Sequence, residues 1–257
     1  MTTESLPLDR PRRFHFDWLF PAMFRPRQTL ARVAEQTNDT WLTPLLVLTL
    51  IALIHVAVAG PMRQAAVQSG QNLPEVAQWW TPEQLQQYQQ IQSSMTGPVF
   101  IYVFPALLSV LAIWVGWLVL VGILHLVLTL TGGRGSTRVA MNIVAWASLP
   151  FAVRDLAQII FMLTQKQLVV GAALVGFAPN DGTMVSFFLA AVLGLIDFYL
   201  CWHIFLLVVG VRVTTALPLG KAIGGVALTL LVWLSLQALP AFLSSQFGSL
   251  SAIQPFF

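Results

Sequence analysis

Five long apolar segments constrain the fold of this chain more than any other feature. They cover residues 41–60, 98–130, 138–164, 184–211 and 221–243. A helix of about 20 apolar residues crosses the hydrocarbon layer of a membrane. Inside that layer the backbone polar groups must be paired within the protein, and a helix pairs them all within one segment. We therefore predict an all-α integral membrane protein, a helical bundle with five transmembrane helices.

The composition supports a membrane protein and excludes several other classes. Charged residues make up 9% of the chain and hydrophobic residues 57%, whereas a soluble domain has roughly 25% charged residues. The net charge of +3 comes without a basic face, so we expect no nucleic-acid partner. The one cysteine, Cys201, has no companions for a disulfide or a structural metal site. We expect no metal and no cofactor.

Basic residues predict the orientation of the spans. Those expected on the inner side are Arg10, Arg12, Arg13, Arg25, Arg27, Arg32, Arg134, Arg138, Arg212 and Lys221. The opposite loops contain only Arg63 and Lys166. Because cytoplasmic loops are enriched in Lys and Arg, we expect a cytoplasmic N-terminus and an outer C-terminus. The domains are then a cytoplasmic segment at 1–40, a membrane domain at 41–245 and a short uncharged outer tail at 246–257.

Arginines alternate with aromatic residues in the N-terminal segment, over 14–37. Such a mixture suits an element in the headgroup layer, with aromatic rings toward the lipid and cations beside anionic headgroups. The residues that we expect at the membrane surface are Trp18, Phe20, Phe24, Arg25, Arg27 and Arg32. A docking site for a cytoplasmic partner would use the same residues, so both interpretations stay open.

The outer loops are predicted to carry no chemistry. Residues 61–97 are rich in glutamine, and Thr81, Pro82 and Gln84 have the spacing of a helix start with a capping box. We expect an amphipathic helix on the outer leaflet there. The apolar, glycine-rich stretch at 167–182 is too short for a span and is interpreted as an interfacial or re-entrant loop.

Two adjacent charges inside the third span need partners. Burying Arg154 or Asp155 in hydrocarbon costs at least a few kcal/mol, and neighbouring helical residues face different directions. Asp197 in the fourth span lies at a similar depth, so we predict an ion pair between Arg154 and Asp197. Asp155 is left with three alternatives: protonation, a bond to Ser148 or Gln158, or service as a second acceptor for Arg154.

Small residues and one proline predict where helices pack closely. Gly194 shares a face with Asp197, and Gly220 and Gly224 form a small-residue pair in the fifth span. Pro150 removes a backbone donor in the third span, which leaves the carbonyl of Trp146 available to a neighbouring helix. We interpret these positions as contacts between helices.

The polar residues of the spans allow two functions. They form either a structural lock or a proton or ion site in which Arg154, Asp155, Asp197 and His203 line a path. His203 lies six positions from Asp197 and does not share its face. No metal motif and no serine–histidine set appears in the sequence. We therefore predict no catalytic residues and no enzyme.

The stretches "GGRGSTRVAMNIVAWASLPFAVRD" and "LGLIDFYLCWHIFLLVVGVRV" resemble the prokaryotic branch of the Yip (Ypt-interacting protein) family, over roughly residues 20–245. The most telling features are the Gly-Gly turn leading into "ASLP" with Arg154 and Asp155, and Asp197 followed by Trp202 and Gly210. The resemblance implies a five-span membrane domain with a cytoplasmic N-terminus, and we expect the bacterial cytoplasmic membrane as its location.

The resemblance leaves the function open. Eukaryotic relatives act in vesicle traffic and bind Rab-type GTPases. Here "GPVFIY" stands where they have an Asp-Leu-Tyr-Gly-Pro signature, so we expect no GTPase binding. Our leading hypothesis is a non-enzymatic scaffold or adaptor that associates with the lipid bilayer, with copies of itself or with other membrane proteins such as an export system. The alternative is a small proton- or ion-coupled transporter or channel.

Overall fold

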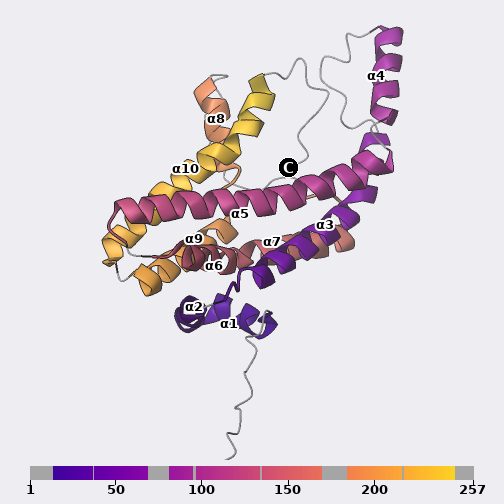
Figure 1. Ribbon diagram of the computed structural model, residues 1–257. Helices are drawn as coiled ribbons and strands as arrows, with labels where there is room; N and C mark the ends of the chain where they lie inside the picture. Colours follow the sequence, from indigo (N-terminus) through magenta and orange to yellow (C-terminus); the bar gives the residue numbers. More distant parts are fainter. Residues whose placement is uncertain are drawn as a thin grey trace, which may run out of the picture.

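The part of the chain that the structure describes is entirely helical (Figure 1). This computed structural model describes residues 14–36, 38–68, 81–94, 97–133, 135–169, 184–215 and 217–246. Five helical stretches within those residues are long and apolar enough to cross a membrane: 42–65, 99–130, 137–165, 198–215 and 219–240. The predicted class, a helical bundle with five membrane-spanning helices, is confirmed.

Two short non-α turns and ten α-helices make up the described elements. A 3-10 turn at Phe16–Trp18 leads into the N-terminal helices, and a π-helical turn at Val99–Val103 leads into α5. The α-helices are α1 (Leu19–Phe24), α2 (Pro26–Glu35), α3 (Leu42–Gln68), α4 (Pro82–Ser94), α5 (Phe104–Leu130), α6 (Thr137–Ala147), α7 (Leu149–Gln165), α8 (Met184–Leu193), α9 (Phe198–Thr215) and α10 (Leu219–Gln246).

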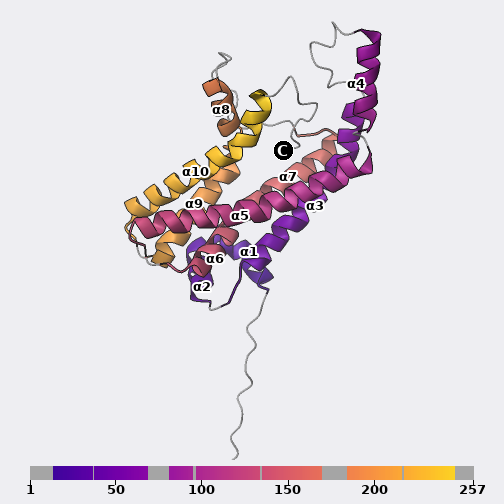
Figure 2. The ribbon, with the colours of Figure 1, turned by 45° about the horizontal axis from the view of Figure 1, so that its top comes forward.

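The long helices run back and forth between two ends of the molecule (Figures 1 and 2). Helices α1 and α2 lie at one end, where α2 packs against α6 and α9. Helices α4 and α8 lie at the opposite end. Between the ends α3 packs along α7, and α5 contacts both α3 and α10. Helix α8 rests on α10.

The core runs between the spans, and the outer faces of the spans stay apolar. Leu45, Leu124, Val144 and Leu207 belong to one buried cluster. Large apolar side chains also point outward, and Leu130 is 78% exposed. Helices that are apolar on all sides are typical of membrane spans. The outward side chains therefore contact the lipid bilayer.

The first span is longer than the apolar run predicts. The sequence suggests that Gly60 and Pro61 end the helix, but α3 continues through Pro61 to Gln68. One proline removes a single backbone donor, and the helix continues beyond it. Gly60 lies against the ring of Tyr102, leaving no room for a side chain. At α4 the predicted capping box is confirmed, because Thr81 and Gln84 exchange two hydrogen bonds.

The third and fourth spans are interrupted, which the sequence analysis did not predict. The third span divides at Ser148 into α6 and α7, with Pro150 in the first turn of α7, where its missing N–H costs nothing. The fourth span was expected as one helix over 184–211. It divides into α8 and α9, and only Phe198–Thr215 is long enough to span.

Two of the predicted packing glycines make no close contact among the described residues. Gly220 and Gly224 have nothing within 4 Å of the place where a Cβ would stand. Gly210 of α9 makes a close contact instead, because a Cβ added there would collide with Ile143, and a Cβ added to Gly225 of α10 would stand 3.5 Å from Leu128. A spacing of four residues marks a small face but does not say which way that face points.

Gly194 stands in the turn that follows α8, where its N–H donates to the carbonyl of Ala190. It therefore belongs to the interruption of the fourth span, and its close contact with another helix stays a prediction. Most of the predicted loop at 167–182 and nearly all of the predicted tail at 246–257 lie outside the described residues.

Candidate functional site

Three charged side chains meet where α7 faces the interruption between α8 and α9. Nη1 of Arg154 lies 3.5 Å from Oδ2 of Asp197, so the structure contains the expected ion pair. Nε of Arg154 lies 3.3 Å from Oδ1 of Asp155. Of the three alternatives for Asp155, the structure has the second acceptor for the same arginine. All three side chains are partly buried, with Arg154 at 36% exposure.

The interruption of the fourth span determines how Asp197 is presented. Asp197 stands directly before α9, and its Oδ1 accepts the N–H of Leu200 at 2.7 Å. One carboxylate oxygen thus caps the helix while the other faces Arg154. A carboxylate at a helix N-terminus is also stabilised by the helix dipole. The sequence analysis placed Asp197 in mid-helix and therefore missed the cap.

Aromatic contacts hold Arg154 in place. Its guanidinium lies over the ring of Phe151, 5.1 Å from the centroid, at the distance of a cation–π contact. The same ring lies 5.0 Å from the ring of His203. Phe151 thus separates the charged group from His203, so the two are neighbours without direct contact.

His203 joins α9 to the break in the third span. It is fully buried, and its Nδ1 donates to the carbonyl of Ala147 at 2.8 Å. Its Nε2 has no partner among the described residues. The sequence analysis expected the carbonyl of Trp146 to be the free acceptor. The carbonyl of Ala147 is available because the N–H of Phe151, which would pair with it in a continuous helix, donates to Ser148 instead.

A histidine of the first span completes the polar group. His55 of α3 interacts with the side chain of Gln158 and with the charge of Asp155. The group therefore draws on α3, α7 and the start of α9. His55 was not among the predicted site residues. Its position in an otherwise apolar span was the available signal.

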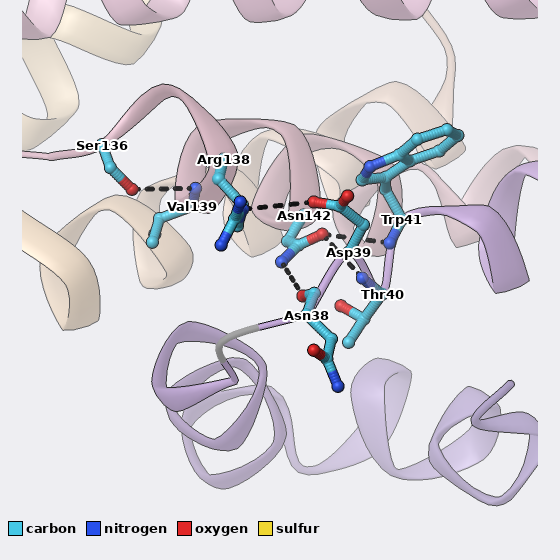
Figure 3. Close-up of polar contacts among 8 residues, drawn as sticks. All are labelled: Asn38, Asp39, Thr40, Trp41, Ser136, Arg138, Val139 and Asn142. Carbon is cyan, nitrogen blue, oxygen red and sulfur yellow. Dashed lines mark hydrogen bonds and ion pairs between the residues drawn. The ribbon is translucent and has the colours of Figure 1, made fainter. Parts of the chain in front are cut away.

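A second polar junction lies at the start of the first span (Figure 3). Asn142 of α6 is fully buried, and its Oδ1 accepts the N–H groups of both Thr40 and Trp41 at 3.0 Å. Its Nδ2 donates to the carbonyl of Asn38 at 3.4 Å. These donors immediately precede α3, where no helical acceptor exists for them. Asn142 thus joins the third span to the first.

Neighbouring contacts extend this junction. Nε1 of Trp146 donates to the hydroxyl of Thr40 at 3.2 Å, and Arg138 pairs with Asp39 at 3.3 Å in an exposed position. The sequence analysis missed Asn142. A lone asparagine in an apolar segment was the signal, because a buried amide needs partners.

The N-terminal helices dock on the bundle. Of the residues predicted at the membrane surface, Trp18 takes part in this contact. Leu30 and Val33 of α2 are buried against Trp146, and Trp18 packs on the same ring with centroids 6.0 Å apart. Phe20 and Phe24 are 72% and 71% exposed. Trp18 therefore packs on the protein, whereas Phe20 and Phe24 point away from it, and the place of these residues at a membrane surface stays a prediction.

The chemistry that the site supports is electrostatic. Among the described residues no group of three His, Cys, Asp or Glu side chains could hold a metal ion. The charged group instead contains one guanidinium between two carboxylates. Such an arrangement can join helices, and a group with an excess carboxylate can also bind a proton or a cation.

Comparison with known proteins assigns the family. A model of the Yip1 domain matches residues 21–239 of the chain. Neither the search of curated proteins nor the search of solved structures found a match. The match begins within α1, includes α2 and the first four spans, and ends one residue before the end of the fifth span. The chain belongs to the Yip1 domain family and is a polytopic membrane protein.

Proposed function

We propose that this Yip1-domain protein is a non-enzymatic scaffold or adaptor of the bacterial cytoplasmic membrane. The observation that carries the proposal is a contrast between the inside and the outside of the bundle. Inside, Arg154 pairs with both Asp155 and Asp197. Outside, the span that contains α5 buries the smallest share of its residues, 22%. Members of the Yip1 domain family are generally non-enzymatic proteins of membrane trafficking.

The outer face of α5 is the surface that we assign to partners. Leu107, Leu111, Val115 and Leu118 are each at least half exposed. They recur at intervals of four, four and three residues, which places them along one face of the helix. Lipid alone can cover such a stripe. A second membrane protein, a further copy of this chain or a component of an export system can cover it as well.

The lock that we assign to the charged group keeps that surface in one shape. Arg154 ties α7 to the start of α9, and Asn142 ties α6 to the start of α3. Polar contacts are retained inside membranes where their partners are satisfied. In this proposal Pro150, Gln158 and His203 are structural residues. The N-terminus is cytoplasmic, the C-terminus is outside, and no GTPase is bound.

Site-specific photo-crosslinking in intact membranes tests the scaffold function. A photoreactive residue at Leu118 on α5 should give a crosslink to one protein, or to a second copy, at high yield. The matched control is Leu231 on α10, which is 65% exposed and should label lipid alone. If both positions label only lipid, and the chain extracted with native lipid is a solitary monomer, the scaffold function is contradicted.

One observation favours a second candidate function, a small proton- or ion-coupled transporter. Two carboxylates share a single guanidinium, and His55 interacts with the charge of Asp155. The surplus negative charge could take up a proton or a cation. Purified protein in vesicles should then show a flux that Asp155→Asn abolishes. If no proton or cation flux appears although the protein is folded, this candidate is excluded.

A further inference from the structure

A large groove is lined by the first turn of α2, by α9 and by the start of α10. These helices meet at the end of the bundle where the N-terminal helices dock (Figure 1). Its volume is about 1020 Å³, which is at the upper end of the range for ligand-binding pockets. The end of α1 and the first turn of α2 form one wall, and α9 with the start of α10 forms the other. The scaffold proposal makes no use of this groove.

The charges of the groove have a single sign. Arg25 and Arg27 line it from the side of α2, and Arg212 lines it from the last turn of α9. No Asp or Glu is among its lining residues, and none of the three arginines has a recorded ion pair with a described residue. Three guanidinium groups without carboxylates attract an anion with several oxygen acceptors.

Apart from Gln28, the remaining residues that line the groove are apolar. Phe205, Val213 and Ile223 are among the lining residues. Phe205 and Arg212 are seven positions apart, so they lie on the same face of α9 about 10 Å apart along its axis. Arg212 stands near the end of the span, and Phe205 stands two turns further from that end along α9. The groove therefore passes from a cationic mouth to an apolar interior.

We infer that the groove binds an anionic phospholipid. Its phosphate would lie among Arg25, Arg27 and Arg212, and an acyl chain would follow α9 past Val213 toward Phe205. Arginine suits phosphate because its planar donors match the phosphate oxygens, and anionic lipid attracts basic residues at the membrane surface. A soluble phosphate compound would satisfy the mouth but would leave the apolar walls uncovered.

Lipid titration of the purified full-length chain, followed by native mass spectrometry, tests this inference. Phosphatidylglycerol should bind at one site at least tenfold more tightly than phosphatidylcholine. Each arginine near a membrane surface contributes about fivefold. Arg212→Gln should therefore weaken binding about fivefold, and the triple Arg25→Gln, Arg27→Gln and Arg212→Gln variant on the order of 100-fold. Arg32→Gln removes a charge from α2 outside the groove and should change nothing.

Two further arms separate the lipid from other occupants. Val213→Trp fills the apolar wall without changing a charge and should also abolish phosphatidylglycerol binding. Inorganic phosphate and glycerol 3-phosphate should compete at least 100-fold less well than the lipid. Equal binding of phosphatidylcholine, unchanged binding by Arg212→Gln and Val213→Trp, or full competition by free phosphate would each overturn the inference. The single variants keep the test decisive if the triple variant does not fold.

Discussion

At the scale of single residues, the structure gives each member of the charged group a separate task. Arg154 lies between two carboxylates. Asp155 pairs with Arg154, whereas Asp197 pairs with Arg154 and also caps α9. Loss of the arginine therefore leaves two carboxylates without a cation, whereas loss of one carboxylate leaves the other paired. The lock proposal predicts an asymmetry between these substitutions.

Arg154→Gln should lower the free energy of unfolding by about 3 kcal/mol, the lower end of the range for breaking a buried pair, because the pair is partly exposed. Asp197→Asn should cost less than about 1 kcal/mol, because Arg154 keeps Asp155 and asparagine can cap a helix. Chemical unfolding of the protein in detergent micelles measures both values.

Two controls accompany that measurement. Asp197→Ala should cost about 1 kcal/mol more than Asp197→Asn, because alanine cannot cap α9. Arg138→Gln makes the same substitution in the exposed pair with Asp39 and should cost less than about 1 kcal/mol. Equal losses for Arg154→Gln and Arg138→Gln would refute the lock.

The hydrogen bonds of Asn142 at the start of the first span lead to a second prediction about stability. Asn142→Ala removes the acceptor of two backbone N–H groups, and each buried donor left unpaired costs about 1–3 kcal/mol. Ser136→Ala removes the cap of the same helix, α6, at an exposed position and should cost about 1 kcal/mol. Thermal unfolding followed by tryptophan fluorescence should show the larger loss for Asn142→Ala. Equal losses of stability for Asn142→Ala and Ser136→Ala would contradict the role that we assign to the hydrogen bonds of Asn142.

At the scale of helices, the interruptions of the third and fourth spans determine which polar groups can bind one another. The division at Ser148 frees the carbonyl of Ala147 for His203. The division before α9 places Asp197 at a helix start. Sequence pattern located every apolar segment, because hydrophobicity is a property of composition along the chain. It did not locate the breaks, because a helix end in lipid depends on whether neighbouring helices supply partners for the freed groups.

Contacts between helices give a prediction with a matched control. Gly210→Ala should be destabilising by about 1–3 kcal/mol, because its Cβ would meet Ile143 and overpacking strains a core. Gly224→Ala introduces the same methyl group into open space and should be neutral or stabilising by up to about 1 kcal/mol. Unfolding midpoints of the two variants decide the matter. A loss at Gly224 equal to that at Gly210 would indicate a contact at Gly224 outside this chain.

At the scale of the whole molecule, the long helices run between two ends, and arginines lie at one of them. Arg25, Arg27 and Arg212 lie at the end where α2 docks, and α4 lies at the other end (Figure 2). The orientation that we propose places α2 in the cytoplasm and α4 outside. It follows from the preference of basic residues for the cytoplasmic side.

Cysteine labelling of intact cells tests this orientation. In a Cys201→Ser background, Glu83→Cys on α4 should react with a membrane-impermeant maleimide added outside. Arg32→Cys on α2 should react only after lysis. Both positions belong to exposed helical surfaces. The opposite labelling pattern, or labelling of both positions from outside, would contradict five crossings with a cytoplasmic N-terminus.

The sequence by itself determined that this chain is a bundle of five apolar helices, because the length and hydrophobicity of the segments leave no other means of pairing the backbone. It also identified Arg154 and Asp197 as partners, because a charge in hydrocarbon needs an opposite charge and these two lie at a similar depth. Only the tertiary structure decided which glycines pack, how Asp197 caps α9, and that Asn142 and His55 take part. Those outcomes depend on how helices rotate and dock, and this follows from the fit of all side chains together rather than from any local pattern.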